Sequence, residues 1–315
     1  IEIVGEKNAV RSYKLGASAI VKLSAIAAKI GMDAFRMKQS LYCAAFKKDI
    51  AFLEREYETR EKHGFKVKWL NEIRVFKQFG FSSPGAILSD LAASTDAYAL
   101  THRLLQYNIQ KGLSVYDRTP VIGIRHDRQS VRLKTREKIA ITAKKLVYAT
   151  GYEVVDFITK PIVKLTSTYA IASENFNRPV RFGEPDTVIW NTAKPYLYLT
   201  TTNDNRIIVG GRDEEFFSHT KRDKLILPKA RQLEKDFKNI FPSIPFKTEF
   251  SWAGVFGSTK DGLPYIGSYK RLPNSFFALG FGGNGITFSQ VAGEIIASLI
   301  KGKKNKDVEI FSFER

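Results

Sequence analysis

The sequence predicts a mixed α/β (α+β) fold, and three observations support this prediction. Residues 1–115 carry apolar side chains mainly at three- and four-residue spacing, which is typical of amphipathic helices. Residues 116–250 contain short β-branched and aromatic runs separated by turn residues, which indicates strands. The end of the chain combines an apolar strand, a glycine-rich turn and an apolar helix. Because no repeat or long linker interrupts this order, we expect interleaved layers in place of separate domains.

The first expected elements are helices, followed by a series of strands. Helices are predicted at residues 10–27, which Gly31 terminates, at residues 50–57, and at residues 96–109, which Asp96 caps. Short strands are then predicted at residues 113–116, 120–125, 131–135, 139–142 and 145–149.

The second half of the chain has a clear hairpin and a clear strand–turn–helix unit. The hairpin joins residues 196–199 to residues 206–209 across the turn Asn-Asp-Asn. The remaining predicted elements are a helix at residues 228–240, a strand at 276–279 and a helix at 286–300.

The composition limits the classes of function. The 315 residues include 50 Lys and Arg against 32 Asp and Glu, so the net charge is +18. The hydrophobic fraction of 43% is high enough to build a core and excludes a disordered chain. In the densest basic segment, residues 123–145, charges alternate with apolar residues, as on the solvated face of a strand pair. No zinc-finger or helix-turn-helix motif accompanies it, so we expect no nucleic-acid partner.

Cysteine and histidine are scarce. A single cysteine, Cys43, excludes an internal disulfide, and the four histidines are scattered, so we expect no metal site and a reducing, cytoplasmic compartment. No uncharged apolar run reaches the ~18 residues of a transmembrane helix. The histidines lack partner spacing and are expected to be surface or capping residues: His63, His102, His126 and His219.

The sharpest local motif is Gly-Phe-Gly-Gly-Asn-Gly at residues 280–285, which matches G-x-G-x-x-G between a strand and a helix. Free N–H groups at a helix start favour an electron-rich ligand such as a phosphate, a carboxylate or a flavin carbonyl. A tight turn without a ligand is the simpler interpretation. A third interpretation is a C-terminal dinucleotide-binding unit with a strand at 308–313 and Glu314 on a ribose. Against it, Glu314 lies further along the chain than the usual ~20 residues.

Three more glycine-containing segments precede this motif: residues 147–152 (VYATGY), 209–214 (VGGRDE) and 252–267 (WAGVFGSTKDGLPYIG). In this order, the four segments resemble the FAD-dependent oxidoreductases of the D-amino-acid oxidase, glycine oxidase and sarcosine oxidase family, from about Phe79 to Arg315. The resemblance implies an enzyme that oxidises a C–N bond of an amine or amino acid by hydride transfer to FAD. It also implies an incomplete FAD-binding domain interleaved with a substrate domain on a mixed, largely antiparallel sheet.

The resemblance assigns domains and cofactor residues. It implies a helical part of the substrate or cap region at 1–115, FAD-domain parts at 116–166 and 251–315, and a substrate-binding sheet at 167–250. The main chain of Val121 matches the family's adenine contact, and Thr287 matches a donor to the flavin O2. The other implied FAD-binding residues are Thr150, Gly151, Gly282, Gly283, Asn284, Gly285 and Ile286.

Two departures from the family pattern modify these implications. The N-terminal strand–GxGxxG–helix that holds the FAD pyrophosphate does not appear in the sequence. We therefore expect a truncated relative without its first ~80 residues, inactive as it stands and with weak or absent FAD. A second hypothesis is a non-catalytic basic module, or a subunit whose FAD-binding half is on another chain.

The second departure concerns the substrate pocket. Phe256 stands where glycine-oxidase-like members carry an arginine for the substrate carboxylate, which favours an amine, an N-substituted amine or a bulkier substrate. Arg212 could replace the lost anion contact, and Trp252 is expected in the core or the pocket wall. Asp261 is expected either in a turn or near the flavin. No catalytic acid or base is assigned, because direct hydride loss requires none.

Overall fold

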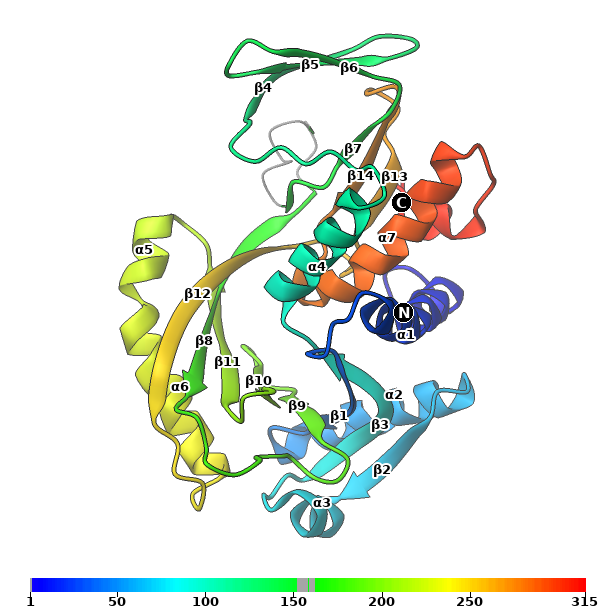
Figure 1. Cartoon of the computed structure of the whole chain (residues 1–315). Coiled ribbons are helices and arrows are strands. Elements are labelled where there is room, and N and C mark those ends of the chain that lie inside the picture. Colours follow the sequence, from blue (N-terminus) through cyan, green and yellow to red (C-terminus); the bar gives the residue numbers. More distant parts are fainter. Residues whose placement is uncertain (1, 152–157, 159–161) are drawn as a thin grey trace. The chain divides into compact units, whose positions relative to one another are not determined.

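The computed structural model describes residues 2–151, 158 and 162–315, and these residues form two compact units (Figure 1). Unit 1 consists of Ile1–Met32, Ala97–Leu165 and Phe256–Arg315. Unit 2 consists of Asp33–Asp96 and Thr166–Val255. Both units therefore combine segments that are distant in the sequence.

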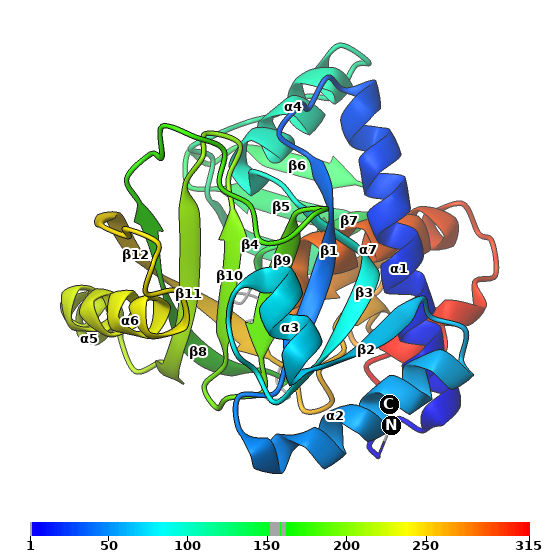
Figure 2. The same cartoon turned by 90° about the horizontal axis from the view of Figure 1, so that it is seen from below.

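Unit 2 is built on an eight-stranded mixed sheet in the order β12-β8-β11-β10-β9-β1-β3-β2 (Figure 2). β1 pairs in parallel with β9, whereas β1–β3, β2–β3, β9–β10, β10–β11 and β8–β11 are antiparallel. The mixed, largely antiparallel sheet expected for the substrate domain is thus confirmed. The strand bounds are Arg36–Cys43 (β1), Val67–Asn71 (β2), Gly85–Ser94 (β3), Lys164–Ser173 (β8), Thr187–Asn191 (β9), Leu197–Thr201 (β10), Ile207–Glu215 (β11) and Thr248–Ser258 (β12).

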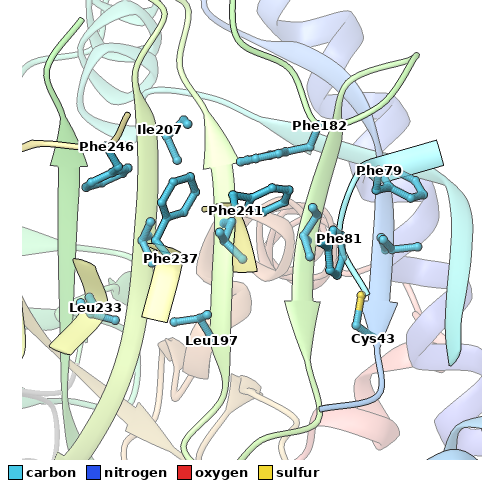
Figure 3. Close-up of a cluster of buried hydrophobic side chains, with 14 of the residues drawn as sticks. Cys43, Phe79, Phe81, Phe182, Leu197, Ile207, Leu233, Phe237, Phe241 and Phe246 are labelled. Atoms are coloured by element: carbon cyan, nitrogen blue, oxygen red, sulfur yellow. The ribbon is translucent and has the colours of Figure 1, made fainter. Parts of the chain in front are cut away.

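Helix α6 (Ile226–Ile240) covers one face of this sheet, because its apolar residues recur at helical spacing. Leu233 and Phe237 are fully buried there, and the Phe237 ring lies 5.4 Å from that of Phe241. Figure 3 shows these rings against the strand side chains of the same cluster. The short helix α3 (Glu72–Phe79) packs Val75 and Phe79 into the same cluster. We call this side of the sheet the helix-covered face.

Helix α2 (Ile50–Lys62) packs on the opposite face, where Leu53 is fully buried beside Ala44 and Ile87. Ile87 and Leu88 are adjacent in β3, so their side chains point to opposite faces of the sheet. Because Leu88 belongs to the core under α6, Ile87 and α2 lie on the other face. The short α5 (His219–Lys224) precedes α6 and is capped by the Ser218 hydroxyl.

Unit 1 holds two three-stranded sheets and three α-helices among the described residues. In its apolar core, Ala19 of α1 and Ile295 of α7 belong to one buried cluster. Lys22 and Glu294 form an ion pair between the exposed faces of these helices. The element bounds are Glu6–Lys29 (α1), Ala97–Ile109 (α4) and Gly285–Ile300 (α7); Val121–His126, Val131–Thr135 and Ala140–Ala143 (β4–β6); and Leu146–Tyr148, Tyr265–Ser268 and Ser275–Leu279 (β7, β13, β14).

Several predicted elements are confirmed, and some strands were not predicted. The hairpin is present as β10 and β11, and the closing strand–turn–helix as β14 and α7. Residues 1–115 are mainly helical, as predicted, but the strands β1, β2 and β3 also lie there and were not predicted. Their apolar runs are short, and burial against neighbouring strands decides the conformation. No helix in the described ranges is both long and apolar enough to cross a bilayer.

The strand at 308–313 that the third interpretation of the glycine motif requires is not present, since Lys306–Phe311 forms a 3-10 helix. The side chain of Asn305 caps it by accepting a hydrogen bond from the Asp307 N–H, and Ile310 and Phe311 are buried against the core of unit 1. A C-terminal dinucleotide-binding unit needs a strand here, so that interpretation is excluded.

Candidate functional site

Two loops predicted to contact a cofactor leave the same edge of one sheet in unit 1. β14 and β7 run in parallel, with Phe276 opposite Val147 and Phe277 opposite Tyr148. Their carboxyl ends therefore lie next to each other, and the loops that begin there contain Thr150–Gly151 and the glycine motif. The space beyond the carboxyl ends of parallel strands is a common ligand site in α/β proteins. We call this part of unit 1 the carboxyl edge.

The glycines of the carboxyl edge are required by backbone conformation and by close approach. Gly280 has φ +69°, and a Cβ there would lie 2.7 Å from Cγ2 of Thr259. Gly282 has φ +55°, but a Cβ there would meet no described residue within 4 Å, so the described part of the chain leaves space next to it. Gly151 is also in the left-handed region, with φ +62°.

The start of α7 offers hydrogen-bond donors. Its N-cap residue, Asn284, makes no side-chain capping bond, so the N–H groups of the first turn have no such acceptor. The Thr287 hydroxyl, in this first turn, forms no hydrogen bond with any described residue, and its methyl group lies 3.6 Å from the Cβ position of Gly16 on α1. Open space, N–H donors and the positive end of the helix dipole together suit an electron-rich group.

A small cavity lies next to β4 and β7. Its volume is about 200 Å³, and its lining includes Val121, Gly123, His126 and Tyr148. Val121 is 43% exposed and pairs with Thr135 of β5. His126 Nε2 lies 3.2 Å from the Tyr148 hydroxyl, and its Nδ1 lies 3.1 Å from the Pro273 carbonyl oxygen. The structure thus places His126 as a link between β4 and β7 in the cavity wall.

Asp261 does not present a free carboxylate. Arg315 donates to it twice, at 2.6 and 3.0 Å, and the Leu263 N–H donates at 3.1 Å. Burial alone would raise the pKa of Asp261, but these hydrogen bonds lower it overall. Of the two expectations for Asp261, the local turn accounts for these contacts.

In β12, strand alternation defines the side on which the pocket candidates lie. Ala253 packs against the core under α6, so Trp252, Gly254 and Phe256 point to the other side of the strand. A Cβ at Gly254 would lie 3.7 Å from Cγ2 of Thr168 on β8. Trp252 is 42% exposed and lies outside the core.

Arg212 is engaged within unit 2. It occupies a left-handed conformation (φ 57°) at an irregularity in β11, and its Nε and Nη2 atoms donate to the Asp236 carboxylate at 2.7 and 2.5 Å. The hydrogen bonds that Arg212 donates to the Asp236 carboxylate raise the pKa of Arg212. Arg212 and Asp236 line a cavity of about 590 Å³ next to α6, and Cys43 also lines this cavity. Burial raises the pKa of the Cys43 thiol.

Aromatic side chains that sequence reasoning missed lie on the face opposite the helix-covered face. The rings of Tyr42 and Trp190 stack at 3.7 Å with an interplanar angle of 6°. Tyr198 lies across its cross-strand partner Gly210, where a Cβ would be 2.1 Å from the ring. The Tyr196 ring follows at 5.9 Å from that of Tyr198. We call these four residues the aromatic face; the period-two spacing of residues 196 and 198 was its sequence signal.

Burial and nearby negative charge both raise the pKa values of two tyrosines of the aromatic face. Burial raises the pKa of Tyr198 to about 12, and the negative charges of Tyr196 and Asp213 contribute. The pKa of Tyr196 is raised by burial and by Asp213.

Comparison with known proteins adds the family. A family model described as FAD-dependent oxidoreductase matches residues 4–299. The chain belongs to this family. The glycine oxidase of Bacillus licheniformis is 25% identical over 288 residues, which covers 84% of the chain and 72% of that protein. The gamma-glutamylputrescine oxidoreductase of Escherichia coli is 25% identical, with 83% and 61% covered.

The chain spans only part of some relatives, and solved structures of two other proteins have a similar fold. The chain spans 44% of the length of the probable oxidoreductase OrdL of Haemophilus influenzae, with 23% identity over 204 residues. The crystal structure of glycine oxidase from Geobacillus kaustophilus superposes with a TM-score of 0.82 at 21% identity, covering 96% of this chain and 82% of that one. L-Proline dehydrogenase from P. horikoshii gives 0.79 at 19%, with 95% and 81% covered. The expected fold is thus confirmed.

The carboxyl edge combines glycine loops with the uncapped start of a helix, which are features that suit an electron-rich ligand. The structure brings most of the predicted cofactor residues to this edge, and it places Val121 at a cavity that shares Tyr148 with β7. Tyr152, the last residue of the motif that contains Gly151, lies outside the described residues.

Proposed function

We propose that this FAD-dependent oxidoreductase oxidises a C–N bond of an amine or amino acid. The observation that carries the proposal is the carboxyl edge, where glycine loops and an uncapped helix start leave open space and N–H donors. The glycine oxidase and gamma-glutamylputrescine oxidoreductase relatives support the substrate class. When bound, FAD supplies the two-electron acceptor for this oxidation.

Different residues of the chain are assigned to different parts of FAD. We assign the nucleotide portion to Thr150 and Gly151, the adenine edge to the Val121 main chain, and the pyrimidine end of the flavin to residues 282–287. The first turn of α7, together with the Thr287 hydroxyl, stabilises negative charge on that end through N–H donors and the helix dipole. In this family a separate strand–GxGxxG–helix segment holds the FAD pyrophosphate. The sequence matches G-x-G-x-x-G once, at the glycine motif of residues 280–285, so we expect weak FAD binding.

The substrate surface carries an apolar group where related oxidases place an arginine. Phe256 cannot form an ion pair with a carboxylate, and Arg212 already pairs with Asp236. The proposed substrates are therefore amines, N-substituted amines or bulkier amino acids, with Trp252 and the aromatic face as apolar walls. The single buried cysteine suits a reducing compartment, and we propose the cytoplasm.

An anaerobic reduction assay tests the proposal. The chain is incubated with excess FAD and either n-butylamine, sarcosine or glycine, and absorbance near 450 nm, the ordinary oxidised-flavin band, is followed. We expect protein-dependent loss of absorbance with n-butylamine, and a rate at least ~10²-fold lower with glycine. Protein-dependent reduction by glycine alone would contradict the substrate class. Bound FAD that none of the amines reduces would contradict C–N oxidation.

A further inference from the structure

A buried ion pair holds the turn at residues 259–264, which precedes β13 in unit 1. The side chains of Arg315 and Asp261 are 12% and 8% exposed, and two guanidinium nitrogens donate to the carboxylate at 2.6 and 3.0 Å. Arg315 also donates to the Leu263 carbonyl oxygen at 2.6 Å, and the Leu263 N–H donates to Asp261 at 3.1 Å. A planar guanidinium that donates to several acceptors at once fixes their relative positions, and a compact ammonium group does so less well.

Thr259 and Tyr265 lie at the two ends of this turn, and both are held by Arg315 or its partners. The Thr259 hydroxyl donates to the Leu263 carbonyl oxygen at 2.8 Å and lies 3.3 Å from Oδ1 of Asp261. The guanidinium carbon of Arg315 lies 3.9 Å from the centroid of the Tyr265 ring, a distance at which a cation is attracted to an aromatic face. The positions of both residues therefore depend on the guanidinium of Arg315.

The glycine motif begins directly against these two residues. Tyr265 pairs with Leu279, the last residue of β14. Gly280 follows with φ +69°, and a Cβ there would lie 2.7 Å from Cγ2 of Thr259 and 3.9 Å from Cδ2 of Tyr265. Only glycine fits so close to the Thr259 methyl group, so movement of Thr259 changes the space that the Gly280 backbone occupies. Arg315 is thus linked to the first residue of the glycine motif through two contacts.

We propose that Arg315 is a positioning residue for FAD binding, because it fixes the backbone at Gly280, where the loop to the start of α7 begins. This inference rests on the proposed function, since FAD is the ligand assigned to the carboxyl edge. No contact between Arg315 and FAD is proposed. A buried ion pair contributes little net stability compared with apolar residues of similar size, so its expected effect is to select one loop conformation. A binding loop needs such support to keep its donors within about 0.5 Å of the bound geometry.

Two measurements test the proposal, one of them without FAD. Hydrogen exchange by mass spectrometry follows the segment 275–285, with residues 293–300 of α7 as the internal reference. Flavin fluorescence measures the affinity for FAD. The variant is Arg315→Met, and the matched control is Arg11→Met, which removes an arginine that donates twice to Asp307 of the same unit, at 2.7 and 2.9 Å. We expect about tenfold faster exchange and about tenfold weaker FAD binding in Arg315→Met, and changes below about twofold in the control.

Thr259→Ser provides a second test if Arg315→Met does not fold. It removes the methyl group that lies against Gly280 and keeps the hydroxyl that donates to Leu263, so we expect faster exchange in segment 275–285 with an unchanged reference. Unchanged exchange in either variant, unchanged FAD affinity in Arg315→Met, or equal changes in Arg315→Met and the control would overturn the proposal. Because the exchange is measured without FAD, an exchange effect in a chain that does not bind FAD would contradict the proposed function alone.

Discussion

Two adjacent glycines of β11 are expected to respond differently to the same substitution. In Gly210→Ala, the new Cβ would lie 2.1 Å from Cζ and 2.2 Å from the hydroxyl oxygen of Tyr198, which is the movable end of a side chain. In Gly211→Ala, it would lie 2.2 Å from the Tyr196 carbonyl oxygen, which is backbone, and the residue has φ +137°. The first clash can be relieved by rotation of Tyr198, whereas the second cannot be relieved without moving β10.

The structure sets the magnitudes. Displacing the Tyr198 ring should lower the free energy of unfolding by about 1–2 kcal/mol, the usual cost of overpacking. Gly211→Ala adds backbone strain to a rigid clash, so we expect about 3 kcal/mol or more. In a Tyr198→Ala background, Gly210→Ala should become neutral or slightly stabilising, because the obstructing ring is gone and alanine restricts the unfolded chain. Gly211→Ala should keep its cost there.

Urea denaturation of the single and double variants measures these free energies. A coupling near zero between Gly210→Ala and Tyr198→Ala would refute the placement of the Tyr198 ring over Gly210. Equal costs for the two glycine substitutions would refute the distinction between a side-chain clash and a backbone clash.

Three further predictions follow from individual groups. Burial raises the pKa of Asp213, against the Thr168 hydrogen bond and the Lys229 charge, so its ionisation destabilises the fold as pH rises through the raised pKa. Asp213→Asn should therefore add about 1 kcal/mol of stability at pH 8 and little at pH 4 in urea titrations. A loss of stability at pH 8 would contradict this. The pKa of Asp261 is lowered, so its ionised form stabilises the fold at neutral pH, and this stabilisation is lost as pH falls through the lowered pKa. Arg315→Met should therefore lower the free energy of unfolding at pH 7 and have little effect near pH 2. An effect that does not depend on pH would contradict the ion pair. Phe256→Arg should raise the rate of FAD reduction by glycine relative to n-butylamine by about tenfold or more, and an unchanged ratio would contradict the assigned position.

The strand–turn–helix at the end of the chain could be predicted from local sequence. Its glycines require particular backbone conformations, and the apolar repeat of α7 has a helical period, so both signals lie within residues 280–300. The β10–β11 hairpin is also local, since a short turn connects strands that pair with each other.

Features that depend on distant pairing could not be predicted in this way. β1 is a strand because it lies between β3 and β9, and β9 is far along the chain, so its own short apolar run gave an ambiguous signal. The direction of Arg212 depends on the irregularity of β11 against β8, which sets the register of two distant segments. The sequence therefore pointed to Arg212 as an anion contact in the pocket, whereas the structure pairs it with Asp236.

Titration of the chain with FAD, followed by flavin fluorescence, tests whether the carboxyl edge holds the flavin. Gly283→Asp adds a negative charge to the carboxyl edge, and Gly293→Asp adds the same charge further along α7, where a Cβ meets nothing within 4 Å. We expect saturable binding by wild type, at least tenfold weaker binding by Gly283→Asp through repulsion of an electron-rich ligand, and unchanged binding by Gly293→Asp. No binding by wild type, or the same affinity in both variants, would contradict the assignment of the flavin to this edge.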